Sequence, residues 1–170
     1  KNITLMIDAP DVQSFDFSIK KNLDAKSSLF EDIKFLLQDA RQLAQKNNDK
    51  KIIIHTIIEK IIVDEKIYNE FPNDNIDYKS IALELKFIYI SEIFYNTIIK
   101  HFKLIHIEVD SVLCSSYVKS LNYNQYFNDY NKKTFLDIGY KKSCVTVFDE
   151  DKLILFRTIP LGGNHITQDI

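Results

Sequence analysis

The sequence predicts a mixed fold of the α+β or α/β class, with a compact α+β unit followed by three closely spaced strands. Helical and strand patterns in residues 28–109 follow the order α-β-β-α-β. All three glycines of the chain lie after residue 138, where strand patterns dominate. The 170 residues, 45% of them hydrophobic, are enough for one domain with a sizeable core or for two small ones.

Composition excludes several classes of protein. The 22 Lys and Arg residues nearly balance the 24 Asp and Glu residues, so no basic surface for nucleic acid is expected. The sequence contains no run of about 18 apolar residues, which is the length needed to span a membrane. It also does not open with the charged and then apolar segment of a signal peptide. Cys114 and Cys144 are too few for a disulfide framework or a zinc site, and the four histidines lack metal-ligand spacing. We therefore expect a cytoplasmic protein.

The first two segments predict a pair of strands. Residues 3–7 are mostly apolar, and residues 14–19 alternate strictly between apolar and polar side chains. The turn-forming run Ala9-Pro10-Asp11 lies between them. We expect the two strands to pair as a hairpin.

The α+β unit begins with a helix over residues 29–46. Ser28 and Glu31 have the spacing of a capping box, in which each side chain bonds the backbone N–H of the other. Apolar residues then recur at helical spacing. After this helix the sequence predicts two extended segments, a loop and an alternating strand, at residues 52–58, 61–63, 68–78 and 81–90.

The unit continues with a helix capped by Ser91, whose apolar side carries Ile93, Phe94, Ile98 and Phe102. Residues 105–109 predict a short strand. This order suggests an antiparallel sheet with the helices packed on one face. A short helix over residues 115–121 and a low-complexity connector over residues 122–131 follow. Three strands are then expected at residues 134–138, 143–148 and 153–159.

The candidate chemistry lies at the turn after the first of these three strands. An Asp at the end of a strand, then Gly, then a hairpin can hold phosphates, because backbone amides and a small hydroxyl cradle the oxygens. Asp137, Gly139 and Ser143 occupy these places. The Asp could also hold a metal ion through water. A plain hairpin with a glycine in its turn is the alternative.

The end of the chain adds a more specific pattern. Residues 159–170, Ile-Pro-Leu-Gly-Gly-Asn-His-Ile-Thr-Gln-Asp-Ile, follow the third strand. Together with Asp137-Ile138-Gly139, this run resembles the start of the second lobe of the bacterial cell-division protein FtsA, an actin-like ATPase. Residues 28–109 resemble the inserted 1C subdomain of that family, and His55 lies where the family has a histidine in an apolar strand.

The resemblance implies part of an actin-like ATPase core of the ribonuclease H-like type, with an inserted α+β subdomain of the 1C type. It divides the chain into a strand pair of the first lobe, the insert, a return with a connector, and the start of the second lobe: residues 1–27, 28–109, 110–132 and 133–170, respectively. Because the chain starts within a strand and ends at the beginning of a helix, we expect a fragment of a longer protein.

The resemblance also implies a site for ATP and magnesium, with Asp137 holding Mg²⁺ through water. The nucleotide would be contacted by Asp137, Gly139, Lys142, Ser143, Gly162 and Gly163. The two later glycines would let the next helix begin close to the turn. The family usually has Gly-Gly-Thr after Asp-Ile-Gly, whereas this chain has Tyr140-Lys141-Lys142. Lys142 would therefore either pair with phosphate or be a solvated turn residue, and we expect at most a slow ATPase.

For function, the resemblance implies a cell-division protein that tethers FtsZ filaments to the inner membrane, acts in septum formation and self-assembles through the insert. FtsZ and other division proteins would be its partners. It would lie on the cytoplasmic face of the inner membrane and touch the membrane only through a C-terminal segment absent here. PilM, a type IV pilus assembly adaptor with the same actin-like core, is the close alternative. An actin-like sugar kinase or chaperone ATPase is a third candidate.

Overall fold

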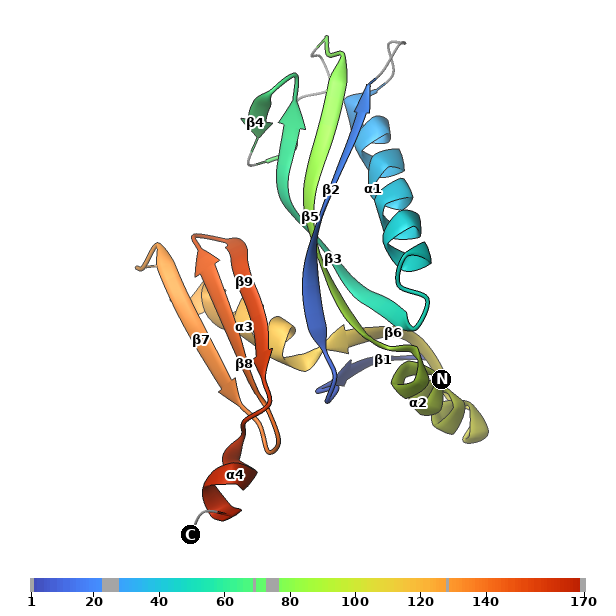
Figure 1. Ribbon diagram of the computed structural model, residues 1–170, viewed down its shortest axis with the longest axis vertical. Coiled ribbons are helices and arrows are strands. Elements are labelled where there is room, and N and C mark those ends of the chain that lie inside the picture. The colour runs from blue at the N-terminus through green and yellow to red at the C-terminus, as the bar shows by residue number, and fades with distance from the viewer. Residues whose placement is uncertain (1, 23–27, 69, 73–76, 128, 169–170) are drawn as a thin grey trace.

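The computed structural model describes residues 2–22, 28–68, 70–72, 77–127 and 129–168 (Figure 1). Part of the predicted loop, residues 73–76, and the last two residues of the family-like run lie outside this description. The elements are, in chain order, β1 (Asn2–Ile7), β2 (Gln13–Asn22), α1 (Leu29–Lys46), β3 (Lys51–Val63), β4 (Lys66–Tyr68), β5 (Ser80–Ser91), α2 (Glu92–Leu104), β6 (Glu108–Cys114), α3 (Ser115–Tyr126), β7 (Lys132–Ile138), β8 (Ser143–Asp149), β9 (Lys152–Ile159) and α4 (Gly163–Gln168).

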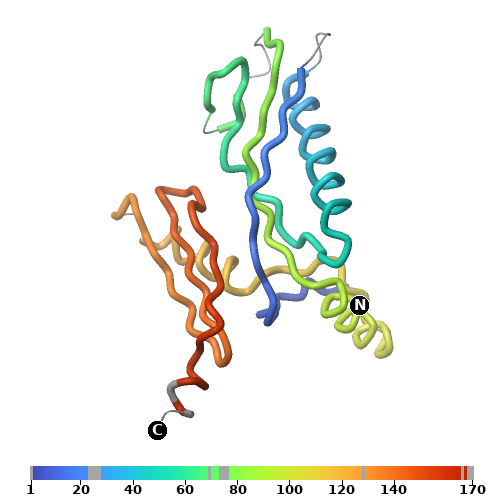
Figure 2. The backbone as a smooth tube through the Cα atoms, viewed as in Figure 1, coloured from blue at the N-terminus to red at the C-terminus, as the bar shows by residue number. Residues whose placement is uncertain are grey.

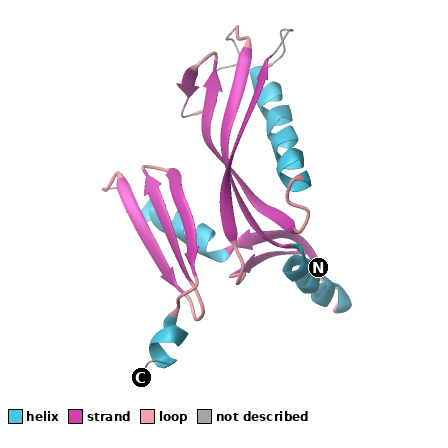
Figure 3. Ribbon diagram, viewed as in Figure 1, coloured by secondary structure: helices cyan, strands magenta, loops and turns pink. Residues whose placement is uncertain are grey.

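The strands form three sheets, shown in magenta in Figure 3. β1 and β6 pair in parallel as a two-stranded sheet. An antiparallel four-stranded sheet has the order β2-β5-β3-β4, and a three-stranded antiparallel sheet has the order β7-β8-β9. The last three predicted strands are therefore confirmed. In Figure 2 the four-stranded sheet and α1 form the upper part of the molecule, and the β7–β9 sheet stands beside its lower part.

The predicted hairpin between the first two strands is wrong. β1 pairs in parallel with β6, whereas β2 pairs antiparallel with β5 along all of its ten residues. The two strands serve different cores, because Leu5 of β1 packs in one cluster and Phe15 and Phe17 of β2 pack in another. Alternation identifies a half-buried strand, but it does not name the partner strand.

The predicted composition of the α+β sheet also needs correction. The strand expected at residues 105–109 is shifted, since β6 spans Glu108–Cys114 and belongs to the two-stranded sheet. β2, which lies outside the predicted unit, completes the four-stranded sheet instead. His106 in the turn before β6 has a φ of 58°. The apolar Ile105 therefore lies in the turn after α2 rather than in a strand.

The first helix has the predicted bounds, because α1 spans Leu29–Lys46. Its buried apolar stripe faces the four-stranded sheet and comprises Leu29, Ile33, Leu36, Ala40 and Ala44. Ser28 stands at the N-cap with an extended backbone, but its side chain makes no capping hydrogen bond, so the predicted capping box is not formed.

The second helix begins where the sequence predicts. The hydroxyl of Ser91 accepts a hydrogen bond from the Phe94 N–H at 3.2 Å. Phe94, Tyr95 and Ile99 pack on the second core, whereas Ile93 is 77% exposed. α2 therefore packs near β5 and β6 at the lower end of the molecule and does not join α1 on one face of the sheet (Figure 1).

Two further elements are longer than predicted. The extended segments at residues 52–58 and 61–63 form one strand, β3, with register irregularities after Ile53 and Ile58. α3 continues to Tyr126 and takes up the first part of the predicted connector. Asn124 is buried there, and its side-chain amide donates a hydrogen bond to the carbonyl of Glu150 at 3.0 Å. The polar composition of residues 122–126 therefore predicted a connector, although these residues belong to a helix that is held by hydrogen bonds.

Two hydrophobic cores result, and β5 contributes to both. The first lies between α1 and the four-stranded sheet, and it includes Leu83, Leu85 and Phe87 of β5. The second joins Ile88 and Ile90 of β5 to the β1–β6 sheet, α3 and the β7–β9 sheet. No helix among the described residues is long and apolar enough to cross a membrane.

Candidate functional site

The predicted phosphate turn lies at the lower end of the β7–β9 sheet. Ile138 of β7 pairs with Ser143 of β8, and the Gly139 N–H donates a hydrogen bond to the Lys142 carbonyl at 2.9 Å. The turn between the two strands is therefore tight. It lies against two other segments, namely the one that follows β1 and the start of α4.

Of the two glycines predicted to let α4 begin directly against this turn, Gly162 is the one that the close approach requires. A Cβ atom on Gly162 would lie 2.4 Å from the Gly139 carbonyl oxygen and 2.6 Å from that of Tyr140. The Gly163 N–H donates to the Gly139 carbonyl, and the Asn164 N–H donates to the Tyr140 carbonyl, both at 2.9 Å. The first amides of α4 are therefore bound to carbonyl groups of the turn.

Lys142 joins the turn to the segment between β1 and β2. Its side chain is buried, and its Nζ lies 2.9 Å from Oδ1 of Asp8. The same ammonium group also donates to the carbonyl of Ala9. A Cβ on Gly139 would lie 3.3 Å from the Asp8 carboxylate, so the missing side chain leaves room for this contact. Lys142 is thus neither a solvated turn residue nor a free cation.

The other two predicted ligands also have partners within the chain. The hydroxyl of Ser143 donates to the Leu161 carbonyl at 2.7 Å. Asp137 is half-buried, and its Oδ2 lies 3.6 Å from Nζ of Lys119 on α3. No sequence motif pointed to Lys119 or Asp8, because both are ordinary charged residues that the fold brings to the turn.

As arranged here, these side chains do not fit a phosphate group. The ammonium of Lys142 and the hydroxyl of Ser143 would both have to leave their present partners. In the described part of the chain, no three His, Cys, Asp or Glu side chains are grouped so as to hold a metal ion. Binding of ATP and magnesium at this turn therefore stays a prediction from the sequence.

A second candidate site is a groove that no sequence pattern marked. It has a volume of about 370 Å³ and lies between the β3–β4 side of the four-stranded sheet, α3 and the turn from β8 to β9. Its apolar lining includes Ile57, Ile61, Tyr68, Phe71, Tyr117, Leu121 and Leu153, and its charged lining comprises Glu59, Lys60, Glu70, Glu150, Asp151 and Lys152.

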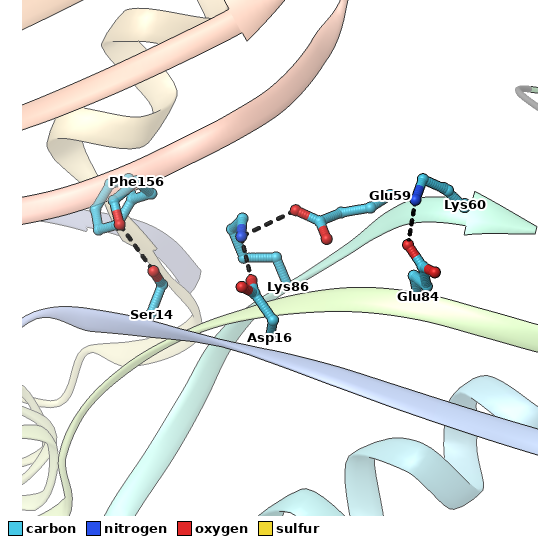
Figure 4. Close-up of polar contacts among 7 residues, drawn as sticks. All are labelled: Ser14, Asp16, Glu59, Lys60, Glu84, Lys86 and Phe156. Atoms are coloured by element: carbon cyan, nitrogen blue, oxygen red, sulfur yellow. Dashed lines mark hydrogen bonds and ion pairs between the residues drawn. The ribbon is translucent and has the colours of Figure 1, made fainter.

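Ion pairs fix the charged residues of one wall of the groove (Figure 4). The Glu59 carboxylate lies 2.9 Å from the buried ammonium of Lys86, which also pairs with Asp16. Lys60 lies 2.7 Å from Glu84. Burial alone lowers the pKa of Lys86, but hydrogen bonds and charges from the two carboxylates outweigh it and raise that pKa above its ordinary value. Lys86 therefore stays charged.

His55 connects the same sheet to α3. Its Nε2 accepts a hydrogen bond from the Cys114 N–H at 2.8 Å, and its ring meets the Tyr117 ring edge-on at 4.9 Å. Burial lowers the pKa of His55 to about 4, so the ring is neutral at pH 7. The histidine of the family-like strand thus has a structural role here.

The two cysteines are both buried and free. Burial raises the pKa of Cys144 to about 12 and also raises that of Cys114. Because the thiolate is the reactive form, neither residue is suited to act as a nucleophile.

Comparison with known proteins identifies the fold. No protein-family model and no curated protein matches this chain. The chain is similar to a chain of a solved structure, the PilM-PilN type IV pilus biogenesis complex, with a TM-score of 0.59 and 10% sequence identity. The chain shares the fold of part of that chain, which supports an actin-like fold. The similarity covers 92% of this chain and 42% of the other, so this chain spans less than half of the chain that it matches.

At this level of identity the similarity establishes the fold and not the family. It gives no support to the predicted cell-division function, to a role in the septum or to FtsZ as a partner. The structure that it matches is a pilus complex, which agrees better with PilM, the alternative drawn from the sequence.

Proposed function

We propose that this chain belongs to an actin-like adaptor of the PilM kind, which holds a segment of a partner protein on the cytoplasmic side of the inner membrane. The observation that carries this proposal is the 370 Å³ groove between the four-stranded sheet, α3 and the β8–β9 turn. The actin-like fold shared with a chain of a pilus complex supports it. Function then depends on protein contacts rather than on catalysis.

The chemistry of the groove suggests what kind of segment it holds. Its lining is apolar between the charged residues, so it suits one or two large apolar side chains. Glu59 and Lys60 are already paired, and Glu70 and Glu150 are exposed acidic residues of the lining. A segment with a basic residue beside its apolar side chains would complement these carboxylates.

The proposed adaptor function does not require nucleotide binding. Lys142 and Ser143 already bind groups of their own chain, which supports a turn that holds the fold together. ATP and magnesium would then bind weakly at most, and fast turnover is not expected.

Binding of short peptides tests the adaptor proposal directly. Fluorescent synthetic peptides that tile the PilN-like protein of the same genome would be titrated into this chain, with fluorescence anisotropy as the readout. We expect one peptide to bind, and Glu150→Lys to weaken its affinity about tenfold or more because a like charge then faces the basic residue. Glu108→Lys makes the same charge change on β6 and is the control.

Two outcomes would overturn the proposal. Binding that is equally weakened by Glu150→Lys and Glu108→Lys would place the peptide outside the groove. Absence of binding by every peptide, together with co-sedimentation of the chain with FtsZ filaments, would favour the cell-division function instead.

A further inference from the structure

The second surface of interest is β2, a long strand at the edge of the four-stranded sheet. β2 pairs with β5 over all ten residues without a register shift, and no described strand pairs with its other edge, although β9 contacts the first residues of β2 through the hydrogen bond from Ser14 to the Phe156 carbonyl. The opposite edge differs, because β4 has only three residues. Long regular edges present unpaired N–H and C=O groups that can pair with another strand, and most proteins shorten, bend or cover them.

A groove runs beside this edge, between β2 and α1. It measures about 530 Å³ and is lined by Ile19, Lys20, Lys21, Leu36, Asp39, Gln42, Leu43 and Lys46. Leu43 is 46% exposed there. The apolar row of β2, formed by Phe15, Phe17 and Ile19, is only partly buried even though it packs against the first core. A strand added to this edge would bury Leu43 and the apolar row of β2.

The sequence of β2 complements itself. When two copies pair antiparallel about a two-fold axis at Ser18, Asp16 of each copy lies opposite Lys20 of the other. The same register places Phe17 opposite Ile19, which is a favourable apolar pair. An axis at Phe17 or at Ile19 would place both charges opposite polar, uncharged residues. Charge complementarity therefore selects one register.

Asp16 has room for this second partner. Its carboxylate pairs with Lys86 of its own chain (Figure 4), yet its side chain is 73% exposed. Lys20 is exposed and lines the groove beside α1. Neither residue would have to leave a buried position.

We propose that β2 is a dimerisation edge through which a second copy of this chain pairs antiparallel about Ser18, joining the two four-stranded sheets into one. The dimer surface is separate from the partner groove, which lies on the β3–β4 side of the sheet. The dimerisation proposal therefore does not depend on the adaptor function.

Cross-linking tests the register. In Ser18→Cys, the axis places the two introduced thiols side by side, with Cβ atoms about 4.5–5.5 Å apart, close to the range of a disulfide. We expect mild oxidation to give a covalent dimer of this variant. Lys20→Cys is the matched control, because its thiol would face Asp16 of the other copy. The native cysteines are buried and do not interfere.

Sedimentation velocity over a range of protein concentrations tests the association itself. We expect a reversible dimer, which Lys20→Glu weakens about tenfold or more because like charges then lie opposite each other in both halves. Lys21→Glu makes the same charge change one residue along, opposite Phe15, and should have little effect. A chain that stays monomeric at every concentration would overturn the proposal. A dimer that Lys20→Glu leaves intact and Ser18→Cys does not cross-link would overturn it as well.

Discussion

The buried ammonium of Lys142 lies 2.9 Å from the Asp8 carboxylate and connects the β7–β8 turn to the segment between β1 and β2. This contact stands where the sequence predicts nucleotide binding. Two hydrogen bonds add to this connection from β9: Ser14 of β2 donates to the Phe156 carbonyl at 2.9 Å, and Thr158 donates to the Val12 carbonyl at 3.0 Å. The turn is thus part of an internal connection between the first strands and the last sheet.

Removing Lys142 should destabilise the fold. Lys142→Ala deletes the ion pair with Asp8 and one of the two hydrogen bonds to the Ala9 carbonyl, which keeps only the Val12 N–H at 3.4 Å, at a cost of roughly 1–3 kcal/mol. Urea unfolding measures this loss. Lys141→Ala is the control, since Lys141 is exposed and should cost less than about 0.5 kcal/mol. Equal losses for the two variants would mean that the contact with Asp8 does not contribute.

Mg-ATP should leave the chain unchanged. Because Lys142 and Ser143 already have partners in the chain, we expect no increase in melting temperature up to millimolar Mg-ATP. Asp137→Ala should behave like the unaltered chain in the same titration. A rise in melting temperature that Asp137→Ala abolishes would establish the nucleotide site that the sequence predicts.

The two adjacent glycines should respond differently to the same substitution. A Cβ on Gly162 would lie 2.4 Å from a backbone carbonyl oxygen, so Gly162→Ala must displace α4 or the turn, with an expected loss of about 1–3 kcal/mol. A Cβ on Gly163 would lie 4.0 Å from its nearest neighbour, and Gly163→Ala should be tolerated. Thermal unfolding of the two variants measures the difference. A similar stability for both would mean that α4 does not dock as described.

Stability should fall with acid through His55. The pKa of this group is lowered to about 4 in the folded chain, whereas an unfolded histidine titrates near 6.5. The unfolded state therefore binds more protons between these values, so the contribution of His55 is complete above pH 6.5 and is lost as the pH falls towards 4. For a half-buried ring this amounts to about 2 kcal/mol. Urea unfolding at several pH values should show the slope, and His55→Gln should reduce it.

Local patterns predicted most of the elements, because periodicity is a property of neighbouring residues. α1 has its predicted bounds since its apolar stripe repeats at helical spacing from Leu29 to Ala44. Ser91 caps α2 through a hydrogen bond within its own first turn. Gly162 also lets α4 begin against the turn as predicted, because a backbone approach this close needs a glycine, whereas the structure leaves room for a side chain at Gly163.

Long-range pairing could not be predicted in the same way. Nothing within the alternating sequence of β2 indicates that its partner is β5, nearly 70 residues further along the chain, rather than β1. The partners of the predicted site residues could not be predicted either, because they are also distant in the sequence. Lys142 resembles any turn lysine until the fold brings Asp8 and Ala9 to it. The groove beside α3 combines residues from β3, β4, α3, β8 and β9 and therefore leaves no motif in the sequence.

The contribution of β5 to two cores bears on how such a module could pass between proteins in evolution. Residues 28–109 lack β2, and a gene fragment with these bounds would leave Leu83 and Phe87 next to an empty sheet edge. Ile88 and Ile90 would also lose the β1–β6 sheet against which they pack. A fragment that keeps the first core and its sheet together therefore spans residues 13–91, and a protein that received it would have to supply an apolar surface for Ile88 and Ile90. A fragment cut at residues 28 and 109 would instead expose the apolar residues of both cores.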